Sequence, residues 1–203
     1  MTSILKVDNI QNASGTSALS IDSSGNIDLT NKAGQILEVL AMNCDGEDYV
    51  VRSGTYTSTN VTAAQVLTTS FVTVTGSEVS YTPPTGTKAV VYEFNYSFRH
   101  VDSHPVFHVR LDLDGSEVVY ARTNVSGNSA LGGRVHFKWV IPIGGTASSN
   151  TGRVASWSTA KTIKLEARDF GSSNEANLHQ TYHWNGSASA QFAAPSICIT
   201  AIG

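Results

Sequence analysis

The segment from Lys88 to Arg99, which reads Lys-Ala-Val-Val-Tyr-Glu-Phe-Asn-Tyr-Ser-Phe-Arg, decides the fold class of this chain. One face of it is aromatic or β-branched and consists of Val90, Tyr92, Phe94, Tyr96 and Phe98. The other face consists of Val91, Glu93, Asn95, Ser97 and Arg99. Alternation of this kind predicts a β-strand, and an aromatic face of this length predicts a strand at the centre of a core.

The segments that follow continue the alternation. Phe107–Leu113 alternates apolar and polar residues and leads through Asp114–Gly115 into Glu117–Ala121. Because Asp-Gly readily adopts the positive φ angles of a tight turn, these segments predict a hairpin. Further strands are predicted at Phe71–Thr75, Val79–Tyr81, Val135–Ile143, Thr162–Ala167, Thr181–Trp184 and Pro195–Ile202.

Only one segment leaves the choice between helix and strand open. Gln35–Met42 fits a helix or a buried strand, and Gly34 together with the β-branched neighbours favours the strand. About eight strands with turns between them, and no long helical pattern after Met42, predict an all-β chain. The expected architecture is an antiparallel jelly roll or β-sandwich.

Residues 1–33 differ from the rest of the chain. Leu19–Ile21 and Ile27–Leu29 flank a Gly-containing turn and predict a small hairpin. Strands this short bury no core of their own. We therefore expect residues 1–33 to anchor and oligomerise the chain, and residues 34–203 to form the sandwich domain. The residues expected to anchor are Ile4, Leu5, Val7 and Ile10.

Composition narrows the possible partners. Charged residues make up 14% of the chain, the net charge is −3, and no basic run occurs, so we expect no nucleic-acid partner. No apolar stretch of about 18 residues predicts membrane insertion, and the N-terminus lacks the pattern of a signal peptide. We expect folding in a reducing cytosol, with Cys198 as a buried free thiol and a disulfide to Cys44 disfavoured.

Three groups of residues resemble metal ligands. His100, His104 and His108 would align on a helix, but the flanking segments are predicted strands. Asp112–Gly115 lacks the distal glutamate of a calcium loop and fits a hairpin turn. Asp45–Asp48 fits a solvated acidic turn better than a weak calcium site. We expect no metal and no cofactor.

Catalysis also lacks a recognisable signature. Hydrolysis needs paired carboxylates or a Ser-His-Asp set, and motifs such as Gly-x-Ser-x-Gly are absent. We therefore expect no catalytic residues and no enzymatic activity.

Four side chains are candidates for contact with a receptor or a neighbouring subunit: Trp157, His179, His183 and His104. Trp157 lies in the Ser/Gly-rich segment 144–160, and loops of this length are often functional. Aromatic faces stack on the C–H surfaces of sugars, so a host-surface glycan is a candidate ligand. Tyr182 and Trp184 share one face of a strand, and we expect them in the core.

Several stretches carry a resemblance to a known group of proteins. They are Ser3-Ile4-Leu5-Lys6-Val7-Asp8-Asn9-Ile10-Gln11, Ala18–Ile27, Gly34–Leu40, Thr68–Val72, Thr82–Lys88 and Ile197–Ile202. In order and character they resemble small fibre-like virion proteins of marine tailed phages, over nearly the whole chain. The polar insertion at Met42–Val51 departs from that pattern and leaves the pairing of the first jelly-roll strand open.

The resemblance implies a homotrimeric virion component without catalytic residues, assembled in the host cytoplasm. Its N-terminal segment would bind other virion proteins, and its jelly-roll head would contact the host surface as part of a tail-fibre-like structure. The alternative is a purely architectural part, such as a head decoration, head fibre or tail adaptor, without receptor binding. A glycan-degrading enzyme and a lectin-like module unrelated to virions are the remaining classes.

Overall fold

Strand β10 (Ala89–His100) is the longest strand of the computed structural model. The structure describes residues 7–11, 13–15, 17–21, 27–29, 33–100, 106–126, 132–184 and 188–203. Val90, Tyr92, Phe94 and Tyr96 are at most 1% exposed, and Phe98 is 6% exposed. The predicted central strand and its inward face are therefore confirmed.

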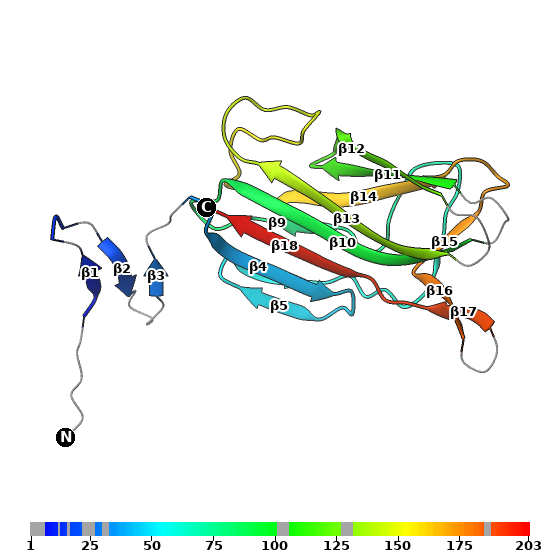
Figure 1. Cartoon of the computed structure of the whole chain (residues 1–203), viewed down its shortest axis with the longest axis horizontal. Coiled ribbons are helices and arrows are strands. Elements are labelled where there is room, and N and C mark those ends of the chain that lie inside the picture. The colour runs from blue at the N-terminus through cyan, green and yellow to red at the C-terminus, as the bar shows by residue number, and fades with distance from the viewer. Residues whose placement is uncertain are drawn as a thin grey trace, which may run out of the picture.

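Two antiparallel sheets form the sandwich (Figure 1). The first, the β10 sheet, places its main strands side by side in this order: β4 (Ile36–Asn43), β18 (Ser196–Ile202), β10 and β13 (Gly133–Pro142). Beyond the end of β18 it continues through β15 (Ala176–Leu178) and β7 (Gln65–Val66). The second, the β11 sheet, consists of β12 (Ser116–Ser126), β11 (Val106–Leu113), β14 (Lys161–Asp169), β8 (Val72–Thr73) and β9 (Val79–Tyr81).

The connectivity is that of a jelly roll. Taken in chain order, the eight main strands are β4, β9, β10, β11, β12, β13, β14 and β18. In the β10 sheet the neighbours are the first, eighth, third and sixth of these strands, which are β4, β18, β10 and β13. In the β11 sheet they are the second, seventh, fourth and fifth, which are β9, β14, β11 and β12. This interleaved order defines the double-sheet jelly roll, so the predicted all-β antiparallel fold is confirmed.

The core lies between the two sheets. From the β10 sheet it receives the aromatic face of β10 with Leu40, Ile141 and Ile199, and from the β11 sheet Phe107, Leu111, Ile163 and Leu165. All seven of these added side chains are fully buried. Alternating residues on two facing sheets thus produce one buried apolar layer, as expected for a sandwich.

The first segments of the sandwich, which the sequence left open, are strands. Gln35–Met42 is strand, since β4 pairs with β18 along its length. The polar insertion after it forms a hairpin of β5 (Asp48–Val51) and β6 (Gly54–Thr57), which the sequence did not indicate. Its half-buried Tyr49, Val51 and Tyr56 pack against the core.

The predicted hairpin turn is present, and the two cysteines do not form a disulfide. Asp114 and Gly115 have φ angles of 56° and 80° and join β11 to β12, so the predicted hairpin is confirmed. Both cysteines are free. Cys198, however, is only partly buried, because Ile197 and Ile199 take the inward positions of β18, whereas Cys44 is the buried thiol.

Besides the β5–β6 hairpin, two smaller sheets lie outside the sandwich layers. β1 (Asn9–Gln11), β2 (Ser17–Ile21) and β3 (Ile27–Leu29) pair with one another, which confirms the predicted hairpin of β2 and β3. In Figure 1 they lie beyond the end of the sandwich where β4 begins. β16 (Gln180–Trp184) and β17 (Ala188–Phe192) form a hairpin at the opposite end. The domain boundary after residue 33 stays a prediction.

Candidate interface and binding surfaces

The outer face of the β10 sheet carries an apolar row. Cross-strand pairing places Val39 beside Thr200, Thr200 beside Val91, and Val91 beside Val140. Val39 and Val140, on the two outer strands of this row of four, are 48% and 47% exposed, whereas Val91 between them is 7% exposed. Figure 1 looks onto this sheet, with β13, β10, β18 and β4 side by side. We call these four residues the apolar row.

The residues next to the apolar row add no net charge. On one side, Glu93 accepts ion pairs from Lys138 at 3.1 Å and from His136 at 3.2 Å if that imidazole is protonated. On the other side lie Ala89 and Ile202. A face that is apolar in the middle and neutralised at its edge has the composition of a protein interface.

The N-terminal sheet precedes the sandwich at the end where β4 begins and β18 finishes. This is also the end nearer to the apolar row. Gly34 N–H donates to the carbonyl of Gly203 at 2.6 Å, and Gly203 N–H donates to the carbonyl of Gln35 at 2.8 Å. Of the residues predicted to anchor, Ile10 is 51% exposed and Val7 is half-buried, whereas Ile4 and Leu5 lie outside the described residues. Ile10 thus offers an uncovered apolar side chain.

Trp157 is not a surface contact, so that prediction is wrong. Its indole is 7% exposed, and Nε1 donates a hydrogen bond of 3.0 Å to the carbonyl of Tyr81. The two rings lie edge to face, 6.4 Å apart. The Ser/Gly-rich segment thus packs the indole of Trp157 against Tyr81, at the end of β9.

His179 is also buried, which corrects the second prediction of a contact residue. It adopts a φ of 59° between β15 and β16, and its N–H donates to the carbonyl of Ser97 at 2.7 Å. Its own carbonyl accepts from the N–H of Ala193 at 2.9 Å. These main-chain bonds hold the residue against β10, where the imidazole is fully buried.

His183 is exposed on the β16–β17 hairpin, as a contact residue must be, and His104 lies outside the described residues. Tyr182 was expected in the core, but it is 36% exposed and the guanidinium of Arg99 lies 5.4 Å from its ring centroid. The hairpin projects from the sandwich, so neither of its faces has a second sheet to cover it. The side chain of Trp184 is not among those described.

The outer face of the β11 sheet holds an open pocket of about 470 Å³, which we call the arginine pocket. Its walls include Phe71, His108, Arg110, Glu117, Arg122 and Arg168. Strand pairing sets His108 beside Arg168 and Arg110 beside Glu166. The outward positions of β11 and β14 therefore bring charges from distant parts of the sequence together.

Both carboxylates at the arginine pocket are engaged. Glu166 binds Arg110 at 2.6 Å, and Glu117 binds Arg122 at 2.6 Å. The hydrogen bond from Arg122 is the main cause of the lowered pKa of Glu117. Arg168 has no carboxylate partner in the described part of the chain, and its Nε is buried without a hydrogen bond. Among the described residues, the guanidinium of Arg168 is therefore the one at this pocket that lacks a carboxylate partner.

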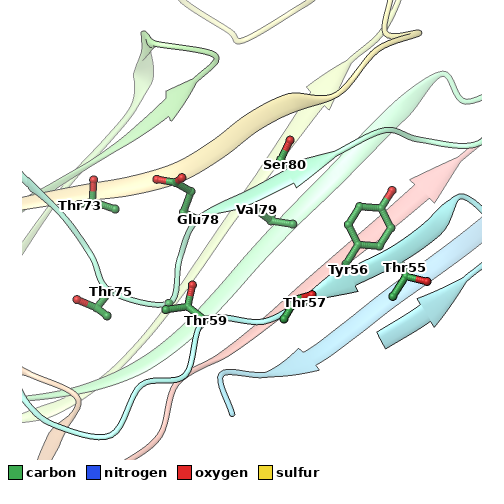
Figure 2. A pocket seen from close by; sticks show the side chains of 10 residues that line it. Thr55, Tyr56, Thr57, Thr59, Thr73, Thr75, Glu78, Val79 and Ser80 are labelled. Carbon is green, nitrogen blue, oxygen red and sulfur yellow. The ribbon is translucent and has the colours of Figure 1, made fainter. Parts of the chain in front are cut away.

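A second open pocket, of about 520 Å³, lies between β6 and the β8–β9 region. Figure 2 shows Thr55 and Thr57 on one side of it, with Thr73, Glu78 and Ser80 on the other. The phenol of Tyr56 is already bound to the carbonyl of Thr82 and to Ser53. The pocket offers hydroxyl groups and a carboxylate, but no free aromatic or cationic group among its described walls.

Within the described ranges, none of the three groups that resemble metal ligands comes together as a metal site. His100 is fully buried in the core, whereas His108 faces outward on β11. Asp45 turns its carboxylate to Ser58, Tyr49 and the N–H of Glu47, as in a capped turn. In the part of the chain that the structure describes, no helix is long and apolar enough to cross a membrane.

Comparison with known proteins adds little. No family model and no curated protein matches the chain. One chain in the structure of infectious bursal disease virus, Gx strain, is similar at a TM-score of 0.42 and 13% identity. The match covers 88% of this chain but only 34% of that one. A likeness at this level supports no statement about function.

Proposed function

We propose that the chain is a non-catalytic structural subunit of a virion, a tail-fibre-like homotrimer that is mounted through residues 1–33 and contacts the host surface. Three parts of this proposal rest on the resemblance of the N-terminal segment to phage fibre-like proteins: the location in a virion, the trimeric state and the mounting through residues 1–33. The observation that carries self-assembly is the apolar row beside the end of the sandwich where the N-terminal sheet joins.

A second copy of the chain is the occupant that best fits the apolar row. β-branched side chains on a sheet face normally pack against another layer, and the exposed Val39 and Val140 have none. Because Lys138 neutralises Glu93 within the same face, this ion pair adds no net charge beside the row. Exposed Ile10 at the same end adds a further apolar contact, so the heads and the N-terminal segments can associate together.

Light scattering on the full chain tests this assembly. We expect the mass of three chains at micromolar concentration, and V140D should shift the protein towards monomers because a carboxylate would be buried at the interface. V50D is the matched control, since Val50 is 79% exposed on the β5–β6 hairpin and is not one of the four residues of the row. A monomeric wild type, or a V140D variant that is as trimeric as V50D, would overturn the proposal.

Mounting is tested by deleting residues 1–32. The truncated chain should keep its sandwich, because the jelly-roll strands begin at Ile36, but it should no longer enter the parent particle. Particles that carry the truncated protein at normal copy number would place the anchor elsewhere.

The competing architectural role, without receptor binding, requires the same row and the same N-terminal segment. It differs only at the far end of the sandwich, where an attachment protein needs a ligand site. The arginine pocket is therefore the feature that separates the two.

A further inference from the structure

We propose that the arginine pocket binds an acidic saccharide, with Arg168 on the carboxylate and Phe170 under the sugar ring. The proposal rests on the attachment role above and names its class of ligand. The pocket lies towards the end of the sandwich opposite Gly34, since its residues flank the start of β11 and the end of β14. A ligand bound there would face away from the mounting segment.

Within the described residues, Arg168 has no acidic partner of its own. Both nearby carboxylates are taken by Arg110 and Arg122, so they leave the charge of Arg168 uncompensated. Its guanidinium lies 5.2 Å from the ring centroid of Phe71, which orients it by cation–π contact. A guanidinium fork matches the two oxygens of a carboxylate, so a planar acid is the natural partner.

Phe170 distinguishes a saccharide from a simple anion. Its side chain is 64% exposed although it is large and apolar. The N–H of Phe170 is bonded to the carbonyl of Val106 at 2.9 Å, which fixes the residue beside the pocket. Its ring lies 5.9 Å from that of His108 in the pocket wall. An exposed aromatic face beside a cation suits a sugar ring that carries an acid group.

Polar side chains on β12 complete the recognition surface. Thr123 and Asn124 line the pocket, and Asn124 is paired across the strands with His108. A hydroxyl and an amide both donate and accept hydrogen bonds, so they match the hydroxyl groups of a sugar. The pocket therefore combines a charge, an apolar platform and neutral polar groups.

Calorimetric titration of the full chain tests the proposal. The probes are a hexamer of galacturonic acid and sialyllactose, each compared with its own methyl ester, in which the carboxylate is neutral. We expect binding of at least one acid and about tenfold weaker binding of its ester, since a charge-assisted pair is lost. If neither acid binds, or if the esters bind equally well, the proposal is wrong.

Substitutions at Arg168 and Phe170 test the role of each side chain in binding. R168Q should weaken binding about tenfold and R168K by less, because lysine keeps the charge but loses the fork. F170A should weaken binding of the saccharide but not of polyglutamate. The control R134Q removes the same charge from an exposed position on the other sheet and should change affinity by less than about twofold.

Several outcomes would overturn the site. Equal losses in R168Q and R134Q would indicate only a general effect of charge. An unaffected F170A, or polyglutamate bound as tightly as the sugar acids, would indicate a generic polyanion surface. Light scattering on the same samples separates the two proposals: a trimer without saccharide binding leaves the assembly standing, and binding by a monomer leaves the pocket standing.

Discussion

The phenol of Tyr81 donates a hydrogen bond of 2.8 Å to Oε1 of Glu38, a carboxylate only 6% exposed on the inward face of β4. Ser53 gives the same carboxylate two more hydrogen bonds, from its hydroxyl at 2.7 Å and its N–H at 2.6 Å. Burial, then the bond to Glu38, raises the pKa of Tyr81, so the phenol remains protonated and available as a donor.

Replacing Tyr81 by Phe should therefore destabilise the fold by about 1.5–3 kcal/mol, the usual range for a lost hydrogen bond to a charged group. Tyr120→Phe is the control, since Tyr120 is 64% exposed, and it should cost less than about 0.5 kcal/mol. Urea denaturation at one fixed protein concentration measures both. Equal losses in the two variants would show that Glu38 does not depend on the phenol.

Substitutions in β10 test the assignment of its two faces. Phe94→Ala should cost about 3–5 kcal/mol, because it empties a fully buried aromatic site. Asn95→Ala should cost less than about 1 kcal/mol, because Asn95 lies on the outer face, paired with His136 and Ser196. A register shifted by one residue would exchange the two results in chemical denaturation.

Acid should weaken the fold through two buried histidines. Burial lowers the pKa of His100 and of His179 to about 4, from 6.5 for an ordinary histidine. Within the described residues, neither ring makes a well-aligned hydrogen bond, although the main chain of Thr75 partly opposes the lowering of the pKa of His179. As the pH falls, these histidines take up protons in the unfolded chain before they do so in the folded chain. The stability that depends on their neutral form is therefore complete above about pH 6.5 and is lost progressively towards pH 4.

Thermal unfolding between pH 7.5 and 4.5 measures this loss. His179→Asn should reduce the pH dependence, because asparagine does not titrate and tolerates the positive φ angle at this position. His183→Asn should leave it unchanged, since His183 is exposed. An identical pH dependence in wild type and His179→Asn would show that the buried imidazole is not a cause.

Two glycines with similar φ angles should respond differently to alanine. At Gly132 (φ 74°) a Cβ atom would lie 2.0 Å from the carbonyl oxygen of Phe98, whereas at Gly115 (φ 80°) it would meet nothing within 4 Å. Gly115→Ala should cost about 1 kcal/mol from backbone strain alone. Gly132→Ala should cost clearly more, because the main chain of β10 would have to move. Equal melting temperatures would contradict the close approach.

The parts of the fold that could be predicted are those in which one strand carries its own signal. The aromatic alternation of Tyr92, Phe94 and Tyr96 and the Asp114–Gly115 turn are legible without knowledge of their partners. β7 and β15 are only two and three residues long and exist because β10 continues beyond the end of β18. The β5–β6 hairpin lies in a polar stretch, and its outer side combines Asp48, Thr55 and Thr57 with the exposed Val50, so the sequence shows no clear alternation there.

The candidate sites were less accessible to sequence reasoning. Trp157 was expected outside because its neighbours are polar, but the partner that buries it, Tyr81, is distant in the sequence. Arg110 stands at an outward position of a predicted strand and Arg168 directly follows another, yet only the pairing of β11 with β14 brings them to the same pocket. Phe170 directly follows β14, and its exposure was not indicated by composition.

The joining of Gly34 to Gly203 has a mechanical consequence. In the proposed attachment role, force would enter at Gly34 and leave near the arginine pocket at the opposite end, so tension would run along the strands. The hydrogen bonds between β4 and β18, which span seven residue pairs, lie across that direction. These hydrogen bonds would be loaded together in shear, and would not be broken one after another by peeling. A head joined in this way resists being pulled from its mount while bound to a surface.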